Sequence, residues 1–299
     1  KDEDIFLGHH RLSIIDTSPK SNQPMKFGDH IIVFNGIIYN YIDLRSKLIA
    51  KGHVFNSSGD TEVIIKMFLE YGNNCVNYLD GVFSFCIYNK AKKNIFLARD
   101  RFGIKPLYYS INQKHIVFSS SVKGIINYKN NKQINPIALN YQFTLHSAVP
   151  APHTIISGIN KLEPGCVMNI SKSGKKYINK YFDIETIDIS DLPDTEIIEK
   201  SKFLLNEAIR KRLKIADVPV GILLSGGLDS SLITAISKKY KDKISTYSIG
   251  FESINQEIGN EFYYSDKVSK SFKTEHSKYN ISDIELYENL DNVIQDMSE

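Results

Sequence analysis

The sequence predicts an α+β domain followed by an α/β domain. Short β-branched and aromatic runs separated by turn residues dominate the first half of the 299-residue chain, as in a meander-rich sheet. Beyond residue 185 or so, apolar strands alternate with segments of helical periodicity, which is typical of a parallel sheet. An acidic, proline-containing stretch separates the two patterns. We therefore expect domains at residues 1–182 and 197–299, joined by a linker at residues 183–196.

The first half is expected to lay helices against a sheet system. Two β-branched runs flank the dipeptide Asn35-Gly36, which predicts a hairpin turn there. Residues 39–51 then turn helical, and residues 61–71 have apolar side chains at helical spacing, with Asp60 placed to cap the N-terminus. Further strands are predicted at residues 82–88, 94–98, 107–111 and 115–119.

The second half begins with an amphipathic helix at residues 197–214. The segment VGILLSGGLDSSLITAI, residues 220–236, then opens with a short apolar run that predicts a strand covered on both faces. Apolar residues resume at helical spacing from Leu232. Another strand is predicted at residues 244–251. This alternation is what predicts the α/β class.

The SGGLDSS loop, residues 225–231, is the most informative part of the chain. Gly226 and Gly227 permit a tight turn, and free N–H groups should lie at the positive end of the following helix. Such a loop holds phosphate. An ordinary strand-to-helix turn is the simpler alternative, but it needs only one glycine and one capping side chain. A Walker loop is excluded because no Gly-Lys-Ser/Thr follows the glycines.

Composition limits the classes of partner and the cellular compartment that we expect for the chain. The chain is 42% hydrophobic and 24% charged, which is ordinary for globular domains and excludes a disordered chain. A net charge of +3 is too small to indicate a nucleic acid partner, and no apolar run is long enough to span a membrane. Cys75, Cys86 and Cys166 are widely spaced, which suits reduced, packed thiols. We expect a cytoplasmic protein without nucleic acid or membrane partners; a homodimer is left open.

Five motifs occur in a fixed order ahead of the SGGLDSS loop. They are LGHHRLSIIDTSPKSNQPM, VFNGIIYNYIDLR, GDTEVI, LDGVFSFCIYNKAKKNIFLARDRFGIKPLYY and VPAPHTIISGINKLEPG. In this order the chain resembles the glutamine-hydrolysing asparagine synthetase family. The resemblance implies an Ntn-hydrolase-like αββα sandwich, which is a class II glutamine amidotransferase domain. An incomplete α/β domain of the ATP pyrophosphatase type, similar to adenine nucleotide α-hydrolases, would follow it.

The resemblance implies an ATP-dependent ligase with ATP and Mg²⁺ as cofactors and with glutamine, aspartate and ATP as small-molecule partners. Asparagine would form from aspartate and ammonia derived from glutamine or taken up free, with release of AMP and pyrophosphate. The SGGLDSS loop would hold pyrophosphate, Asp229 would lie near Mg²⁺, and two apolar residues would border adenosine. The implied ATP-site residues are Leu223, Ser225, Gly226, Gly227, Leu228, Asp229, Ser230, Ser231 and Ile249.

For glutamine, the resemblance implies a clamp and an oxyanion hole. Arg11 would bind the α-carboxylate through paired bonds, and Asp60 would accept from the α-ammonium. Asn35 and Gly36 would supply the catalytic oxyanion donors. Taken singly, these residues have simpler interpretations as a surface charge, a helix cap and a hairpin turn. The implied glutamine-site residues are Arg11, Leu12, Ser13, Ile14, Ile15, Asn35, Gly36, Ile37 and Asp60.

Two features depart from the family pattern. The family's nucleophile is an N-terminal cysteine with its own amine as base, whereas this chain begins at Lys1 and its cysteines are internal. The family's second synthetase motif also does not occur before Glu299, so we expect a chain truncated at both ends. Ile37 stands where the family usually has Glu; losing that contact with the ammonium predicts glutamine use weaker by about 1–3 kcal/mol.

We predict no catalytic role for the other groups that the sequence singles out. The ARDRFGIKPL signature, residues 98–107, is expected to be an ion-paired loop that shapes the domain. Glu261, Tyr264 and His276 have core or surface roles as their simplest interpretation. Three other functions stay open: an amidotransferase or β-lactam-forming enzyme acting on another carboxylate, such as a sugar acid; a non-catalytic binding or regulatory relative; and a tRNA-modifying enzyme, which the low net charge disfavours.

Overall fold

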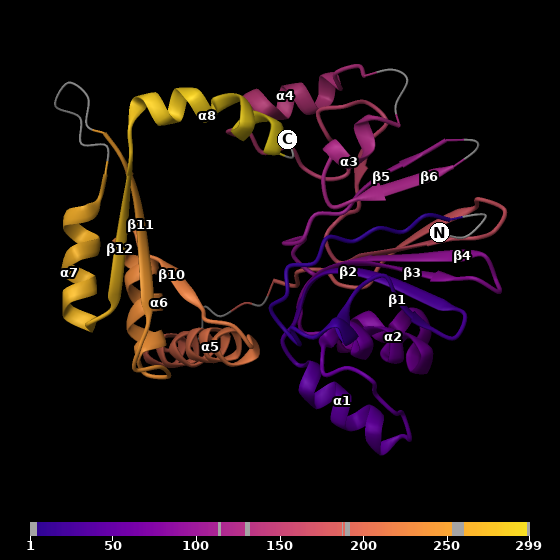
Figure 1. Cartoon of the computed structure of the whole chain (residues 1–299), viewed down its shortest axis with the longest axis horizontal. Coiled ribbons are helices and arrows are strands. Elements are labelled where there is room, and N and C mark those ends of the chain that lie inside the picture. Colours follow the sequence, from indigo (N-terminus) through magenta and orange to yellow (C-terminus); the bar gives the residue numbers. More distant parts are fainter. Residues whose placement is uncertain are drawn as a thin grey trace. The chain divides into compact units, whose positions relative to one another are not determined.

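The computed structural model describes residues 5–112, 115–128, 132–186, 188, 192–252 and 260–297. The chain divides into two compact units: one extends to Glu185, and the other runs from Thr186 to Met297. Figure 1 shows the elements of each unit. Among the described residues, no helix combines the length and apolarity that a membrane crossing requires.

The first unit contains two antiparallel sheets. The larger has the strand order β1-β2-β3-β4-β8-β9, and the smaller has the order β6-β5-β7. The strands of the larger sheet are β1 (Met25–Phe27), β2 (His30–Ile38), β3 (Gly81–Asn89), β4 (Asn94–Arg99), β8 (Cys166–Ile170) and β9 (Lys176–Lys180). Those of the smaller sheet are β5 (Tyr108–Ile111), β6 (Ile116–Ser119) and β7 (Asn160–Lys161). The strands predicted from β-branched runs are thus present, with ends shifted by no more than a residue.

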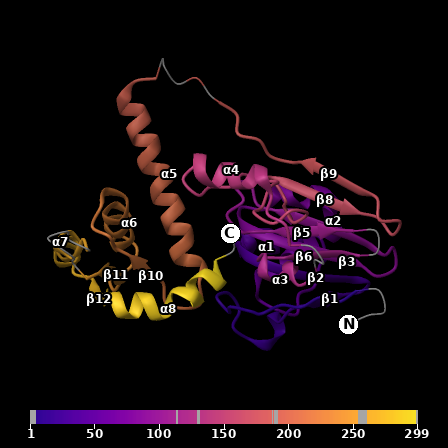
Figure 2. The ribbon, with the colours of Figure 1, turned by 90° about the horizontal axis from the view of Figure 1, so that it is seen from above.

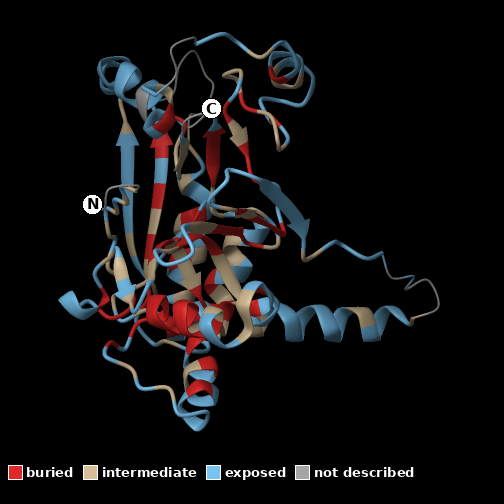
Figure 3. Cartoon of the chain, turned by 90° about the vertical axis from the view of Figure 1, so that its right-hand side faces the viewer, coloured by how far each residue is buried: buried red, intermediate tan, exposed pale blue. Residues whose placement is uncertain are grey.

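The core of the first unit lies between the two sheets. Val33, Cys86 and Leu97 of the larger sheet pack with Leu107 and Tyr109, which lie in and just before β5 of the smaller sheet. Alternate residues of a strand share a face, so each sheet presents its apolar set to the other. Figure 3 shows the buried residues gathered along these strands.

Helices cover the outer faces of both sheets (Figure 1). Helix α2 lies against β1 and β2 with α1 beside it, and α3 lies against β5 and β6. The helix–sheet–sheet–helix order predicted for this unit is confirmed. The helical segments are α1 (Tyr41–Ala50), α2 (Asp60–Tyr71), α3 (Lys123–Ile126), α4 (Pro136–Thr144) and the 3-10 turns η1 (Pro19–Ser21) and η2 (Gly72–Tyr78).

The predicted hairpin at Asn35-Gly36 is wrong. Strand β2 continues through the dipeptide and pairs with β3 over its whole length, with Gly36 opposite Phe83. A type I′ turn needs positive φ at both central residues, but of the two only Gly36 has it, at +155°. A Cβ there would lie 2.2 Å from the carbonyl oxygen of Val82. The glycine therefore reflects the close approach of β3.

The second unit contains a three-stranded parallel sheet in the order β10-β11-β12. Helices α6 and α7 lie against the sheet, and Figure 2 shows them alongside it. The elements are α5 (Asp194–Ile215), β10 (Gly221–Leu223), α6 (Leu228–Lys238), β11 (Ser245–Phe251), α7 (Phe262–Phe272), β12 (Glu275–Ile281) and α8 (Asp283–Asp296). The alternation of strand and helix predicted for this half is present.

Helix α5 begins at Asp194 rather than at residue 197, so it takes in the end of the predicted linker. Pro193 occupies its N-cap, and the acidic side chains of Asp194 and Glu196 favour the first turn through the helix dipole. Most of α5 is exposed (Figure 3).

The prediction that the strand before the SGGLDSS loop is covered on both faces is wrong. Ile222 is 8% exposed, but Leu223 is 73% exposed. Strand β10 forms an edge of the sheet, and the helices cover the face that carries Ile222. In the part of the unit that the structure describes, Ile249 and Phe251 on the face of Leu223 also remain exposed. A short apolar run alone does not distinguish an edge strand from a central one.

Candidate functional site

The first candidate site lies along the edge of β2 that faces away from β3, which we call the β2 edge. The N–H of Phe34 donates to Gln23 Oε1 at 2.6 Å, and its carbonyl oxygen lies 2.9 Å from His9 Nε2. The N–H of Ile38 donates to Asp60 Oδ2 at 3.0 Å. Main-chain groups of alternate residues point to the same side of a strand. The N–H of Gly36 therefore points to this edge, between Phe34 and Ile38.

Asp60 is a buried carboxyl group at the β2 edge. It is the first residue of α2 and only 6% exposed; Gly59 takes the N-cap position that the sequence assigned to Asp60. Burial raises the pKa of Asp60 to about 6, opposed by the hydrogen bond from Ile38 and by the charge of Arg11. A carboxyl group with a raised pKa beside a cation is a candidate for binding a charged ligand.

Arg11 is engaged by the loop that follows it. Its Nη1 donates to the Ser18 carbonyl at 2.9 Å and to Asn22 Oδ1 at 3.2 Å. Its Nη2 donates to the carbonyl of Ile15 at 3.0 Å and to that of Asp16. Both terminal nitrogens of Arg11 therefore already have partners. The resemblance implies a paired contact with a carboxylate, and this contact requires the loop to release at least one of these nitrogens.

Asp16 joins that loop to the turn before α2. Its carboxylate accepts from the hydroxyls of Ser18 and Ser21 at 2.6 and 2.7 Å, and from the N–H of Ser58 at 2.7 Å. Burial alone would raise the pKa of Asp16, but these bonds outweigh it and hold that pKa well below its usual range. Sequence reasoning missed this residue, although an Asp followed by serines is typical of an Asx turn.

Glu62 and Lys66 hold the turn that precedes Asp60. Glu62 Oε2 accepts from the N–H and the hydroxyl of Ser57, each at 2.7 Å. Lys66 Nζ lies 3.5 Å from Glu62 Oε1 and 3.8 Å from the centre of the Phe27 ring. The pair is buried on α2, so one side of the β2 edge is fixed by charges that water does not screen.

The other predicted glutamine-site residues differ in exposure. Leu12 is 83% exposed, whereas Ile15 is buried. Asn35 and Ile37 are half-buried and lie on the same face of β2 as Val33, which packs between the sheets. Their side chains therefore face the space between the two sheets, one residue before and one residue after Gly36.

The ARDRFGIKPL loop is architectural, as predicted, but main-chain groups shape it. Arg99 donates to the carbonyls of Leu162, Gly103 and Lys105, at 2.5, 2.7 and 2.9 Å. Asp100 is 1% exposed and accepts from four N–H groups. Those N–H groups belong to Phe83, Phe102, Ile104 and Lys105.

The three cysteines are free and buried, which confirms their predicted state. Burial raises the pKa of Cys75 to about 12 and also raises the pKa values of Cys86 and Cys166. A thiol of this kind remains protonated at neutral pH, so none of the three has the thiolate character that a nucleophile needs.

The second candidate site is the SGGLDSS loop between β10 and α6. Gly226 has φ +91°, and a Cβ there would lie 2.5 Å from Ser265 N and 2.6 Å from Tyr264 Cβ. The first turn of α7 therefore packs directly against the loop. Only glycine fits at this position.

The loop amides are only partly free. The N–H of Gly226 donates to Ser230 Oγ and that of Gly227 to Ser225 Oγ, each at 3.2 Å. The loop's own hydroxyls thus satisfy two of the amides that the sequence predicted to be bare. Leu228, at the start of α6, is 83% exposed, so the mouth of the loop is open. The first N–H groups of a helix lack intrahelical acceptors, so those at the start of α6 are candidates for binding a ligand.

Two apolar residues lie near the loop on the exposed face of the sheet. All three strands are parallel, so their carboxyl ends meet at the edge where the loop begins. Leu223 pairs with Tyr247, and Ile249 follows two residues later on the same face. Leu223 and Ile249 are 73% and 57% exposed. Both are available on the face that continues from the loop.

The remaining predicted residues of this unit have varied positions. Glu261 is the N-cap residue of α7, Tyr264 is exposed, and His276 is packed, as its simplest interpretation held. Asp229 is exposed in the first turn of α6. Among the described residues, no group of three or more His, Cys, Asp or Glu side chains is arranged to hold a metal ion.

Comparison with known proteins decides the family. Residues 1–182 match the family described as "Glutamine amidotransferase domain", and residues 201–299 match the family described as "Asparagine synthase". The chain belongs to the asparagine synthetase family. The order of the two matches is the order of the two units.

Two asparagine synthetases of Bacillus subtilis illustrate the relationship. Asparagine synthetase [glutamine-hydrolyzing] 1 is 36% identical over 253 residues, which are 84% of this chain and 39% of that protein. Asparagine synthetase [glutamine-hydrolyzing] 3 is 32% identical over 307 residues, 97% of this chain and 49% of that protein. The chain thus spans about half the length of the curated relatives it matches.

A solved structure is also similar at low level. Glutamine phosphoribosylpyrophosphate amidotransferase from B. subtilis, complexed with ADP and GMP, matches with TM-score 0.44 and 12% identity. The match covers 94% of this chain and 77% of that one. Membership of the asparagine synthetase family rests on the sequence matches.

Proposed function

We propose that this chain forms part of an ATP-dependent amidotransferase that makes L-asparagine from L-aspartate, releasing AMP and pyrophosphate. The observation that carries the proposal is the SGGLDSS loop at the carboxyl edge of the parallel sheet. Its glycine conformation, its open mouth and the N-terminus of α6 together suit a diphosphate. Membership of the asparagine synthetase family supports the choice of acceptor.

In the proposed nucleotide site, ATP would lie along the loop and the adjoining face of the sheet. The hydroxyls of Ser225 and Ser230 lie 2.9 Å apart and contact the amides of Gly226 and Gly227 at 3.2 Å. These are long contacts, so phosphate oxygens could replace them with stronger charge-assisted bonds. Leu223 and Ile249 would border the adenosine.

The residues present fit a magnesium ion that arrives with the nucleotide. Mg²⁺ is usually held by one or two carboxylates together with phosphate oxygens, and retains several waters. Asp229 supplies one exposed carboxylate beside the loop. The ion would neutralise phosphate charge, and Asp229 would orient it. The carboxylate of the acceptor then attacks the α-phosphorus, pyrophosphate leaves into the loop, and ammonia displaces AMP from the acyl-adenylate.

The β2 edge is proposed to bind glutamine. Ionised Asp60 would accept from the α-ammonium, Gly36 and Asn35 would donate to the developing oxyanion, and Arg11 would contact the α-carboxylate. The raised pKa of Asp60 supports a role for its charge, because a ligand ammonium would offset the unfavourable burial. The side chain of Ile37 cannot accept a hydrogen bond from the ammonium. We therefore propose weak glutamine binding, with free ammonia as the other nitrogen source.

A second acceptor class remains a candidate because of Ile37. If glutamine is not the main nitrogen donor, an amidotransferase with another carboxylic acid as substrate, such as a sugar acid, fits the same nucleotide site. The chemistry at phosphorus is unchanged, since it needs only a carboxylate nucleophile and the SGGLDSS loop.

Calorimetry with Mg-ATP, Mg-pyrophosphate and glutamine tests the proposal. We expect the chain to bind both phosphate compounds at one site, to bind glutamine weakly, and to lose Mg-dependence of ATP binding in Asp229→Asn. Exchange of labelled pyrophosphate into ATP, measured with one candidate carboxylic acid at a time, then identifies the acceptor. Exchange with aspartate supports asparagine synthesis, and exchange with another acid supports the second candidate. Absence of uptake of either phosphate compound would falsify the nucleotide site.

A further inference from the structure

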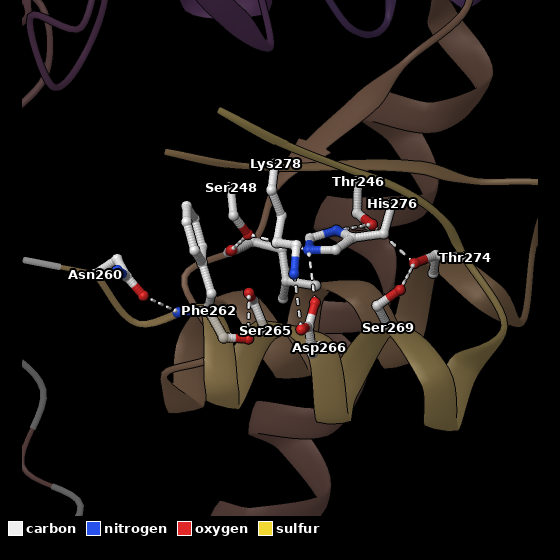
Figure 4. Close-up of polar contacts among 11 residues, drawn as sticks. Thr246, Ser248, Asn260, Phe262, Ser265, Asp266, Ser269, Thr274, His276 and Lys278 are labelled. Carbon is white, nitrogen blue, oxygen red and sulfur yellow. Dashed lines mark hydrogen bonds and ion pairs between the residues drawn. The ribbon is translucent and has the colours of Figure 1, made fainter. Parts of the chain in front are cut away.

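A buried imidazole lies on the face of the parallel sheet that the helices cover. His276 on β12 has only 8% of its side chain exposed. Its Nδ1 lies 2.9 Å from Thr246 Oγ1, and its Nε2 lies 3.4 Å from Ser248 Oγ (Figure 4). Both hydroxyls belong to β11 and lie on the face that the helices cover. The ring therefore contacts two buried hydroxyl groups of the neighbouring strand at once.

The Ser248 arm of this network reaches the residue that precedes the loop. Ser248 Oγ donates to the carbonyl of Leu224, the residue immediately before Ser225. The N–H of Leu224 donates to the Tyr247 carbonyl at 2.7 Å. Leu224 is 1% exposed, so both of its main-chain groups are held by β11 in a buried place. The bond from Ser248 fixes the peptide that joins the sheet to the loop.

The Thr246 arm leads to α7, which packs against the other side of the loop. Thr246 Oγ1 lies 2.7 Å from Thr274 Oγ1, which donates to Ser269 Oγ at 3.0 Å (Figure 4). Ser269 belongs to α7, whose first turn abuts Gly226. Through two arms, one imidazole thus connects three elements that position the loop.

Charged groups also face the ring. Asp266 Oδ1 of α7 lies 3.8 Å from His276 Nε2, and its other oxygen accepts from Lys278 Nζ at 2.8 Å. The carboxylate is already paired with a lysine and lies beyond hydrogen-bond distance from the ring. The hydroxyls therefore make the closer contacts with His276.

We infer that His276 is a positioning residue for the SGGLDSS loop and acts through Ser248 on the Leu224 peptide. The inference rests on the proposed nucleotide site and goes beyond it by naming what orients the loop. A histidine that only filled space would not need to contact Ser248, whose hydroxyl donates to the carbonyl just before the loop. A buried polar group is expensive unless it is bonded, so a chain of bonds that ends at the loop points to a positioning role.

Four single variants separate the two arms. Ser248→Ala removes the bond to Leu224. His276→Asn keeps a polar atom near the Nδ1 position and loses the Ser248 arm, whereas His276→Gln keeps one near Nε2. Ser269→Ala is the matched control, because it removes a buried hydroxyl at the far end of the Thr246 arm. Thermal unfolding of each variant establishes that it is folded.

Two measurements are compared on the whole chain: Mg-ATP affinity and amide hydrogen exchange within residues 225–231. We expect Ser248→Ala and His276→Asn to weaken Mg-ATP binding about tenfold, the effect of about one hydrogen bond, and to speed loop exchange. His276→Gln and Ser269→Ala should stay within about threefold of wild type in both, since they keep the Ser248 arm.

The outcomes are distinguishable. If Ser248→Ala and His276→Asn behave like Ser269→Ala in both measurements, the network is merely structural and the inference is overturned. If wild type takes up no Mg-ATP, the proposed nucleotide site fails, but the exchange comparison still decides whether His276 positions the loop.

Discussion

The two candidate sites are held by different forces. At the β2 edge, buried carboxylates from Asp16, Asp60 and Glu62 hold main-chain N–H groups of separate segments. At the SGGLDSS loop, hydroxyl groups and one imidazole make the hydrogen bonds that hold the main chain. The critical position is Gly226, which has φ +91°. The first site is therefore sensitive to charge and pH, and the second to backbone geometry. Each prediction below tests one side of this contrast.

The largest effect is expected from Asp100→Ala in the first unit. Removing this carboxylate leaves one buried N–H group and three part-buried N–H groups without their acceptor, so the free energy of unfolding of the unit should fall by about 3–5 kcal/mol. Urea unfolding followed by hydrogen exchange in β3 measures this loss. Glu199→Ala is the control: Glu199 is exposed and forms a surface ion pair with Lys202, so no measurable change is expected. A midpoint for Asp100→Ala equal to that of wild type would contradict the charge-held picture of this unit.

Gly226→Ala should have the next largest effect, through geometry alone. The new Cβ would meet the first turn of α7 and the residue would keep a positive φ, at a cost of about 2–4 kcal/mol. Binding of both Mg-ATP and Mg-pyrophosphate should be lost, as calorimetry would reveal.

Gly174→Ala is the matched control for that variant. Gly174 has φ +81°, but no atom lies within 4 Å of the Cβ position. It should cost only about 1 kcal/mol of backbone strain and leave nucleotide affinity unchanged. If Gly226→Ala binds both compounds as tightly as Gly174→Ala does, loop geometry is not what the second site depends on.

What the sequence could predict follows the range of the interactions. The strands β3, β4, β5 and β6 were predicted almost to the residue because each carries its own β-branched pattern. The prediction of a hairpin at Asn35-Gly36 was wrong because pairing with a strand distant in sequence determines the conformation of that segment. Gly36 lies opposite Phe83 of β3, and a dipeptide signal contains nothing about a strand so far along the chain.

The same distinction holds for the sites. The SGGLDSS turn was predictable because its glycines and serines interact with one another. The bond from Ser58 to Asp16 and the contact of His276 with Ser248 join residues far apart in sequence, and no spacing rule reveals such pairs. Arg11 was predicted to bind glutamine, but its hydrogen bonds to nearby carbonyls depend on a loop conformation that the pattern does not encode.

Asp60→Asn should change stability in a pH-dependent way. The pKa of Asp60 rises from its ordinary 3.8 to about 6 on folding, so the folded state binds more protons between these values. Stability from this group is full below pH 3.8 or so and is lost as pH rises through about 6. At pH 7 the variant should therefore be more stable than wild type by about 1–3 kcal/mol, with little difference at pH 4. Its glutamine binding should be weaker than that of wild type at pH 7, where Asp60 is ionised, and the difference should shrink below pH 6 or so.

Asp266→Asn in the second unit should change the free energy of unfolding in the opposite direction. The hydrogen bond from Lys278 lowers the pKa of Asp266, so this carboxylate stabilises the fold above its ordinary pKa and the variant should be slightly less stable at neutral pH. Urea midpoints between pH 4 and pH 8 or so compare the two variants. Shifts of the same sign in both would refute the contrast between a buried carboxyl group and a half-exposed carboxylate paired with a lysine.

The smallest effect is expected from Leu223→Ser, which tests the exposed face beside the loop. Leu223 is 73% exposed, so the substitution should leave stability unchanged, whereas Ile222→Ser, at a position only 8% exposed, should destabilise the unit strongly. If Leu223 borders adenosine, the loss of apolar contact should weaken Mg-ATP binding by about threefold to tenfold, which corresponds to about 1 kcal/mol. Mg-pyrophosphate has no adenosine, so its affinity should not change, in contrast to Gly226→Ala, which removes both. Calorimetry with the two compounds separates these cases, and equal weakening of both by Leu223→Ser would mean that this face acts through the loop rather than on the base.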